Sequence, residues 1–512
     1  MRPAMHPYIH ARKFPDKPAY LMAGSGEIVT YGQLDRQSNR IAQLFRSLGL
    51  QAGDHVAIFM ENNARFFEIC WGAQRSGLIY TAISSRLTAP EVDYIVGDCG
   101  AKLFVTSKHL AERAAELRPL MGNAPHRFMV DSPIDGYASW EEAVARQPAT
   151  PIADQTQGHD MLYSSGTTGR PKGVLPVVPK QPIDAENPLL AITSKLYGMD
   201  TDTIYLSPAP LYHAAPLRFN MSVMRLGGTS VIMENFDAED YLRLVGKHRI
   251  THTQVVPTMF VRFLKLPDEV RAKYDVSSLK CAIHAAAPCP IPVKERMIEW
   301  WGPIVWEYYG GTEGNGLTMC NATEWMAHKG TVGKAVVGKL KICDDAGEEL
   351  PSGEPGTVYF ADGRPFEYHN DPKKTAESRH PKGWTTLGDV GFVDADGFLH
   401  LTDRKAFMII SGGVNVYPQE AENVLAVHPA VADVGVFGVP DDDLGEVVHA
   451  VVQPAPGVVG DDALVAELIA HCRSQLATIK CPRTISFRDE LPRLPTGKLY
   501  KKQLRDEYLA AK

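Results

Sequence analysis

The feature that most constrains this chain is residues 161–174, with the sequence Met-Leu-Tyr-Ser-Ser-Gly-Thr-Thr-Gly-Arg-Pro-Lys-Gly-Val. The apolar run 161–163 predicts the end of a buried strand, and glycines, hydroxyls and cations follow it. Glycine lets a backbone turn tightly, and successive N–H groups in such a turn suit phosphate oxygens. Position 171 holds Pro, so the segment is not a Walker A loop. We therefore predict a nucleotide phosphate loop of another kind.

Length and composition limit the class of protein. With 512 residues the chain is too long for one core, so about three packing units are expected. An apolar share of 44% and a charged share of 22% are typical of a globular protein. The net charge of −7, without a long basic stretch, argues against nucleic acid as a partner. Eight cysteines without a C-x-x-C pair, no signal-peptide pattern and no transmembrane segment predict a cytoplasmic protein with free thiols.

The first third of the chain alternates between helical and strand patterns. Thr30 is expected to cap a helix that ends at Gly49, and residues 55–60 predict a strand. A helix over 63–77 and a strand over 102–106 continue the alternation, which favours a mostly parallel sheet covered by helices. The later segment 176–188 contains four prolines and is expected to be a surface loop.

Residues 163–173 resemble the signature loop of the adenylate-forming superfamily, which includes acyl- and aryl-CoA synthetases, peptide-synthetase adenylation domains and firefly luciferase. The family usually has Thr where Ser164 stands. Further motifs follow in the family's order at 309–314, 383–389, 403–418 and 495–498, so the resemblance covers essentially the whole chain.

The resemblance implies sites for ATP and Mg²⁺. Glu313 follows a glycine-rich turn and would bind Mg²⁺, which prefers carboxylate and phosphate oxygens. Tyr309 would pack on the adenine, Thr312 would contact the α-phosphate or substrate carboxylate, and Asp389 and Arg404 would bind the ribose side. The predicted nucleotide-binding residues are Ser164, Ser165, Gly166, Thr168, Gly169, Ala286, Ala287, Pro288, Tyr308, Tyr309, Gly310, Gly311, Thr312, Asp389 and Arg404. The predicted catalytic residues are Lys498, Thr167, Lys172 and His213.

An acyl pocket is expected beside the nucleotide. No Asp or Glu occurs between Pro208 and Phe219, which argues for an uncharged acyl tail because a buried cation would need a partner. Small residues predict a roomy apolar pocket that suits a medium-to-long or polycyclic acid. The predicted lining is His213, Ala214, Ala215, His284, Ala285, Gly310 and Gly311.

The predicted fold class is α/β with two domains. Residues 1–402 would form a large ATP- and acyl-binding domain of helix-covered, mostly parallel sheets plus a small β-rich subdomain at 331–360. Residues 403–406 would be a hinge, with Ala406 where relatives usually carry Lys or Asp. Residues 407–512 would form a small mobile α+β domain that carries Lys498 and presents Gly412 and Gly413 to CoA.

The leading functional hypothesis is an ATP-dependent acyl-CoA synthetase. It would convert a hydrophobic carboxylic acid (medium- or long-chain, aryl or steroid-type) to an acyl-adenylate, and then to the CoA thioester, releasing AMP and pyrophosphate. One alternative is an acyl-AMP ligase that passes the acyl group to a carrier protein or an amine. A second is an oxygen-using luciferase-like oxidase or an inactive acyl-nucleotide binder. The intact Glu313 and Lys498 argue against the inactive binder. The expected partners are the acid and CoA, and the oligomeric state is left open.

Overall fold

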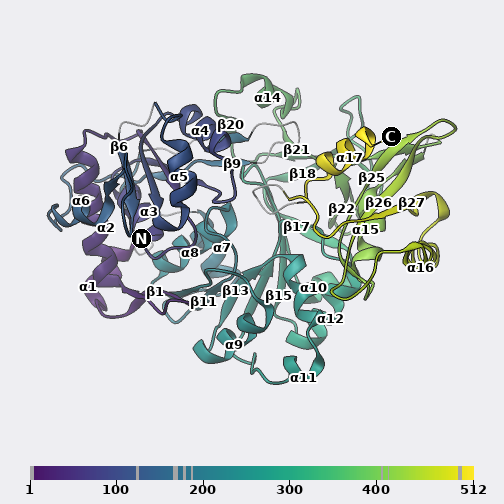
Figure 1. Ribbon diagram of the computed structural model, residues 1–512, viewed down its shortest axis with the longest axis horizontal. Coiled ribbons are helices and arrows are strands. Elements are labelled where there is room, and N and C mark those ends of the chain that lie inside the picture. The colour runs from purple at the N-terminus through teal and green to yellow at the C-terminus, as the bar shows by residue number, and fades with distance from the viewer. Residues whose placement is uncertain are drawn as a thin grey trace.

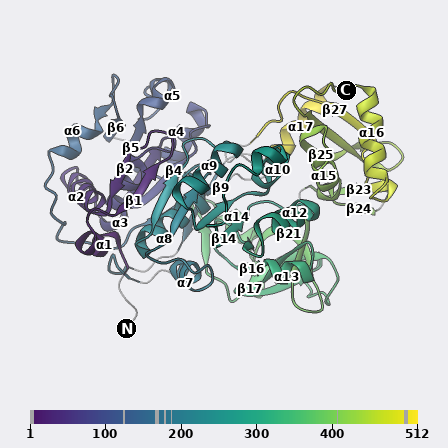
Figure 2. The same cartoon turned by 90° about the horizontal axis from the view of Figure 1, so that it is seen from below.

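A computed structural model describes residues 5–122, 126–164, 171–176, 180–185, 188–404, 407–412, 414–493 and 499–511. The α/β class is confirmed, with helices packed on several sheets (Figure 1). Figures 1 and 2 both place the C-terminal elements at the opposite end of the molecule from α1 (Pro7–Lys13) and α2 (Tyr31–Ser47). In the described part of the chain, no helix is long and apolar enough to cross a bilayer.

The first sheet is parallel and has the order β7-β6-β5-β3-β4-β8. The helices α2 and α3 (Arg65–Arg75) lie where the sequence predicts them, whereas α4 to α6 were not predicted. α2 begins at a capping box formed by Thr30 and Gln33. The central strands β3, β4 and β5 are mostly buried because helices cover the sheet. The strands are β3 (His55–Phe59), β4 (Ile79–Ile83), β5 (Ala101–Ser107), β6 (His126–Val130), β7 (Ala138–Ser139) and β8 (His159–Asp160). The helices are α2, α3 (Arg65–Arg75), α4 (Ala89–Asp98), α5 (Ala111–Leu117) and α6 (Trp140–Ala145).

The largest sheet runs through the middle of the molecule and contains thirteen of the described strands, in the order β18-β19-β21-β22-β17-β16-β15-β14-β13-β11-β12-β1-β2. Its central strands are parallel, and pairing becomes antiparallel from β15 onward. The predicted β-rich hairpins therefore continue this sheet. The parallel part has β1 (Pro18–Met22), β11 (Ile204–Ser207), β12 (Thr229–Ile232), β13 (His252–Val255), β14 (Cys281–His284) and β15 (Val305–Tyr309). The remainder has β2 (Ile28–Thr30), β16 (Leu317–Asn321), β17 (Thr331–Val337), β18 (Lys339–Cys343), β19 (Gly356–Ala361), β21 (Thr385–Val393) and β22 (Leu399–Arg404).

Two apolar layers cover the parallel half of this sheet. One contains residues of α8, including Phe219, and the other is built around α9, α10 and α12. Neighbouring strand residues therefore alternate between the layers, as Ile283 and Ala282 of β14 do. The helices are α8 (Ala214–Leu226), α9 (Ala238–His248), α10 (Pro257–Lys265), α11 (Asp268–Arg271), α12 (Ile291–Trp301) and α13 (Ala322–Ala327).

A small antiparallel sheet holds the predicted phosphate loop. The strands β9 (Leu162–Ser164) and β10 (Lys172–Pro176) pair on either side of the loop, and β20 (Phe366–Tyr368) pairs with β10. Within the proline-rich segment, residues 180–185 are not helical, and α7 (Pro188–Lys195) begins at the last proline. Proline is tolerated there because the first turn of a helix needs no N–H donor.

The C-terminal elements form a separate sheet with its own apolar core. The strand order is β24-β23-β26-β25, with β27 parallel to β26, and α15 and α16 contribute residues to the core. The elements are β23 (Ile409–Ser411), β24 (Val414–Val416), α15 (Pro418–Ala426), β25 (Val431–Asp441), β26 (Gly445–Pro454), α16 (Asp462–Arg473), β27 (Thr484–Phe487) and α17 (Lys501–Ala510).

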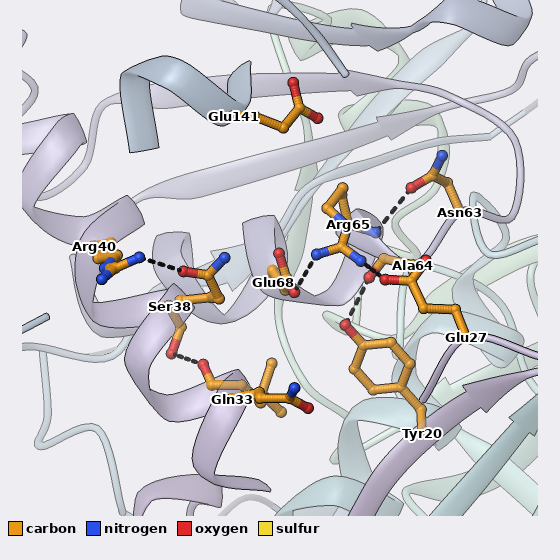
Figure 3. Close-up of polar contacts among 12 residues, drawn as sticks. Tyr20, Glu27, Gln33, Ser38, Arg40, Asn63, Ala64, Arg65, Glu68 and Glu141 are labelled. Carbon is orange, nitrogen blue, oxygen red and sulfur yellow. Dashed lines mark hydrogen bonds and ion pairs between the residues drawn. The ribbon is translucent and has the colours of Figure 1, made fainter. Parts of the chain in front are cut away.

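A buried carboxyl group lies in the first turn of α3 (Figure 3). Arg65 pairs with Glu68 at 2.9 Å and also with Glu27, while the Tyr20 hydroxyl donates to the Ala64 carbonyl at 2.6 Å. Glu68 is only 2% exposed. Burial raises the pKa of Glu68 to about 7, although the Arg65 charge opposes this rise.

Glu68→Gln should change the pH dependence of folding. Between the ordinary pKa of 4.5 and the folded value of about 7, the folded protein keeps a proton that the unfolded chain has lost. The Glu68 contribution to the free energy of unfolding should therefore fall by about 1.4 kcal/mol for each pH unit in that window. Urea unfolding should show that, from pH 5 to pH 7, the free energy of unfolding of the wild type falls relative to that of Glu68→Gln. Glu142→Gln, at an exposed position, is the control, and an equal trend in both variants would contradict the assignment.

Candidate active site

Lys172 is held beside the predicted phosphate loop by a carboxylate. It begins β10 directly opposite Ser164, and its Nζ lies 3.1 Å from Asp371 Oδ2. Asp371 caps α14 (Pro372–Glu377) by accepting a hydrogen bond from the backbone N–H of Lys374 at 2.9 Å. The Lys374 N–H and Lys172 together lower the pKa of Asp371. The predicted loop residues Ser165, Gly166, Thr167, Thr168 and Gly169, and the side chain of Ser164, lie outside the described residues.

Glu313 lies in the turn between β15 and β16. The Tyr368 hydroxyl, from β20, donates to Glu313 Oε1 at 3.0 Å, so the turn is connected to the sheet that holds Lys172. An added Cβ at Gly311 would lie 2.5 Å from Glu313 Oε2 and 2.7 Å from Leu387 Cδ1, so a side chain there would displace the ends of both side chains. Gly314 has a φ of +64°, a conformation that favours glycine.

The predicted ribose-binding residues come together on adjacent strands. The Tyr309 hydroxyl at the end of β15 donates to Asp389 Oδ2 at 2.7 Å, and its ring stacks on Phe360 with 6.2 Å between centroids. Asp389 is 7% exposed. The register of β21 and β22 places the backbone of Arg404 directly opposite Asp389, while the Arg404 side chain lies outside the described residues.

The donor set around Glu313 suits magnesium. Among the described residues, no group of three or more His, Cys, Asp or Glu side chains is arranged to hold a metal ion. Magnesium bound with a nucleotide needs only one or two protein carboxylates, because phosphate oxygens and water complete its octahedron. Glu313 supplies such a hard oxygen donor at the end of a partly exposed turn.

His213 and the small residues after it lie at the start of α8. His213 occupies the N-cap position, and its ring lies edge-on to Tyr212 with 4.6 Å between centroids. Ala215 packs against a cluster that contains Phe219 and Tyr308, whose rings are 6.3 Å apart. Tyr205 also stacks on Phe219, so the rings of Tyr205, Phe219 and Tyr308 belong to one aromatic layer, against which Ala215 packs.

Tyr308 belongs to this apolar layer, whereas Tyr309 faces Asp389. Successive residues of a strand point to opposite faces of the sheet. The end of β15 therefore contributes Tyr308 to the apolar layer and Tyr309 to the contact with Asp389. Burial raises the pKa of Tyr308 to about 12, and the nearby Arg218 charge opposes the rise.

His284 is the last residue of β14, and the predicted pocket residue Ala285 begins the loop that follows. Ala285 is buried and residues 286–288 are exposed, with Ala286 in the left-handed region at φ +78°. The His284 side chain instead faces the α10 layer, where its ring contacts Phe260 edge-on at 5.3 Å. Its Nε2 lies 3.6 Å from Glu307, which forms a buried ion pair with Lys294 at 2.5 Å. Burial and the Lys294 charge lower the pKa of His284, which favours a neutral ring.

The structure adds three residues that motif analysis missed: Tyr368, Asp160 and Arg218. Arg218 donates to Asp160 Oδ2 through Nε at 3.1 Å and Nη2 at 2.8 Å, and to the Thr312 carbonyl through Nη1 at 3.3 Å. The available signal was a charged residue within an otherwise mostly apolar helix, since such a residue needs a partner when it is partly buried. Tyr368 carried no such signal.

Two predicted residues of the C-terminal part lie outside the described residues, namely Lys498 and Gly413. Gly412 is described and lies at the turn between β23 and β24, with a φ of +56°. Its N–H donates to the Leu444 carbonyl at 2.7 Å.

Family models match most of the chain. The AMP-binding enzyme model matches residues 8–364, and the AMP-binding enzyme C-terminal domain model matches residues 420–498. This chain therefore belongs to the AMP-binding enzyme family, which is the adenylate-forming superfamily that the motifs indicate.

Three relatives illustrate the chemistry within this family. The chain is 33% identical to the fatty acid–acyl-carrier-protein ligase ScoC of Streptomyces coeruleorubidus, over 98% of this chain and 95% of ScoC. It is 31% identical to the long-chain-fatty-acid–CoA ligase FadD13 of Mycobacterium tuberculosis, over 97% of this chain and 96% of FadD13. The solved structure of the anthranilate CoA ligase AuaEII with anthranoyl-AMP superposes with a TM-score of 0.84 at 26% identity, over 100% of this chain and 99% of AuaEII.

Asp371→Asn should strengthen ATP binding. The carboxylate competes with phosphate for Lys172, whereas Asn removes the charge and remains a good helix cap for α14. Partly exposed ion pairs contribute about 0.2–1 kcal/mol, so the dissociation constant for ATP should fall by roughly 1.5- to 5-fold. Isothermal calorimetry with and without the substitution measures this, and Asp371→Ala, which also loses the cap, should in addition lower the melting temperature. Weaker ATP binding by the Asn variant would show that Asp371 assists Lys172.

Proposed function

We propose that this protein is an ATP-dependent acyl-CoA synthetase. It would activate a hydrophobic carboxylic acid as an acyl-adenylate and transfer the acyl group to CoA, releasing AMP and pyrophosphate. The observation that carries the proposal is that three motif residues, Lys172, Glu313 and Asp389, are each oriented by a partner. The matched relatives FadD13 and AuaEII are CoA ligases by name, which supports CoA as the acceptor.

The acyl substrate is proposed to be a hydrophobic medium- or long-chain, aryl or steroid-type acid. Ala214, Ala215 and Ala285 provide small apolar walls, and no described acidic side chain comes from α8 to bind an ammonium group. We expect acids of this kind to be better substrates than acetate, because a pocket lined by small apolar side chains suits a large apolar group.

In the first half-reaction, the substrate carboxylate attacks the α-phosphorus of ATP and pyrophosphate leaves. Phosphoryl transfer of this kind depends mainly on positioning and charge stabilisation. Lys172 and the phosphate loop would hold the phosphates, while Asp389 and Arg404 hold the ribose. Magnesium bound at Glu313 would supply positive charge to the phosphate oxygens. Lys498 is proposed to neutralise the charge that develops between carboxylate and phosphate.

In the second half-reaction, the CoA thiol attacks the acyl carbonyl and AMP leaves. We propose that residues 407–512 rotate about the hinge 403–406, which withdraws Lys498 and brings the Gly412–Gly413 turn to the acyl-adenylate. A hinge residue only needs to absorb a backbone change, so Ala406 is compatible with this motion. All described cysteines are free thiols, which fits the proposed cytoplasmic location.

A second candidate function is an acyl-AMP ligase whose acceptor is a carrier protein or an amine. The 33% identity to ScoC, a carrier-protein ligase by name, is the observation that favours it. Both functions share the adenylation step, so they differ only in the acceptor.

One experiment separates the two functions. Purified protein is incubated with ATP, Mg²⁺ and a panel of acids from acetate through hydroxycinnamates and fatty acids to steroid side-chain acids. Pyrophosphate and thioester are followed with CoA, with an acyl-carrier protein and with a small amine. Thioester with CoA on hydrophobic acids is expected. Pyrophosphate release with transfer only to the carrier or the amine would replace the first proposal by the second.

Lys498→Ala should separate the half-reactions. Losing one group that stabilises the developing charge typically lowers the rate by about 10²–10³-fold, so pyrophosphate formation should fall by that factor. Thioester formation from a supplied acyl-adenylate should continue, because Lys498 is withdrawn in that step. Lys502→Ala, at an exposed position of α17, is the matched control and should leave both rates unchanged. Equal loss of both half-reactions in Lys498→Ala would contradict this role.

A further inference from the structure

Arg218 connects three segments that are far apart in the sequence. It lies in the second turn of α8, at the boundary between the first sheet and the central sheet. Through Nε and Nη2 it binds Asp160, the last residue of β8, and through Nη1 it binds the carbonyl of Thr312. One planar guanidinium therefore fixes the turn after β15 relative to β8. Arginine suits this role because its donors form a rigid fork.

The ion pair is partly buried, which makes it more than a surface contact. The side chain of Arg218 is 28% exposed and that of Asp160 is 15% exposed. Burial alone would lower the pKa of Arg218, but the Asp160 charge more than compensates, so the pKa is raised. A charged hydrogen bond in such surroundings is stronger than a pair that is fully exposed to water.

The turn after β15, which contains Thr312 and Glu313, has a sequence that restricts its backbone conformation very little. Glycine occupies positions 310, 311, 314 and 316, and glycine restricts a backbone less than any other residue. The Thr312 carbonyl belongs to the peptide that leads directly into Glu313. Fixing that carbonyl therefore limits the directions in which the Glu313 side chain can leave the backbone. The Tyr368 hydroxyl then fixes the other end of the same side chain, at Oε1.

We propose that the Arg218–Asp160 pair is a positioning device for the Thr312–Glu313 turn, and that it determines how strongly the protein takes up magnesium-bound ATP. This inference rests on the proposed function, because it assigns Glu313 to the magnesium of the nucleotide. Arg218 acts through Thr312 and Glu313 and is a positioning residue. Three further titratable groups lie near Arg218. They are the Arg364 guanidinium and the Tyr80 and Tyr308 phenols, whose pKa values are raised by burial so that both phenols are neutral.

The same helix offers a matched control. Arg225, two turns further along α8, is 2% exposed and donates to the carbonyls of Met5 and Ile183 at 3.1 Å and to Gln74 at 3.1 Å. Its guanidinium also lies over the ring of Trp71. Arg225 contacts none of the predicted site residues in the described structure, so it tests what loss of a buried arginine in α8 does to folding alone.

The test measures binding of a non-hydrolysable ATP analogue by calorimetry, with Mg²⁺ and with a chelator, for wild type, Asp160→Asn, Arg218→Lys and Arg225→Lys. Residues that orient a metal ligand typically change metal affinity by about 10–100-fold. We expect the gain in affinity that Mg²⁺ provides to fall by about tenfold in Asp160→Asn and in Arg218→Lys. Lysine keeps the charge but lacks the fork that engages Asp160 and Thr312 together. Arg225→Lys should lower the melting temperature and leave the magnesium-dependent gain unchanged.

Two results would overturn the proposal. One is that Asp160→Asn gains as much affinity for the ATP analogue from Mg²⁺ as the wild type does. This variant is isosteric, so it should fold even if Arg218→Lys does not. The other is an equal loss in Arg225→Lys, because this would make the effect a general consequence of disturbing α8. The measurement uses neither acid nor CoA. A wild-type protein that binds magnesium and the analogue but forms no thioester would therefore contradict the proposed CoA ligase activity and still test the positioning role.

Discussion

The candidate site depends on one physical requirement, that each partly buried charged group has a partner even when no substrate is bound. Removing a charge from water is costly unless a hydrogen bond or counter-charge replaces the lost solvation. Lys172 pairs with Asp371, Glu313 accepts from Tyr368, and Asp389 accepts from Tyr309. These partners come from distant segments, so meeting the requirement also assembles the small antiparallel sheet, the central sheet and the turn after β15 into one site.

Much of this arrangement could be predicted from local patterns. The cap at Thr30, the alternation of β3, α3 and β5, and the strand β9 that leads into the phosphate loop each follow from spacing and turn chemistry within a few residues. The motif residues Tyr309 and Asp389 were expected to serve one ligand, and the structure joins them by a hydrogen bond of 2.7 Å. Local rules work here because a strand end, a glycine turn and a cap are each determined by their immediate neighbours.

The contacts that were missed depend on the fold as a whole. Tyr368 meets Glu313 only because β20 pairs with β10, and no pattern near Tyr368 signals that pairing. His284 lies next to Ile283 on a strand with two buried faces, and its ring contacts Phe260 on the opposite face from Ile283. Its place in the acyl pocket stays a prediction. On such a strand both positions are apolar or neutral, so the sequence carries little information about which face each residue takes.

The glycine-rich turn after β15 shows why flexible and rigid elements occur together in this site. A side chain at position 311 would displace the ends of the Glu313 and Leu387 side chains, and Gly314 supplies a left-handed conformation. The same glycines leave the Glu313 backbone poorly restrained. The restraint therefore has to come from side chains outside the turn, and Arg218 on one side and Tyr368 on the other supply it. The geometry of this turn, which is proposed to approach the nucleotide, therefore depends in part on contacts from α8 and β20.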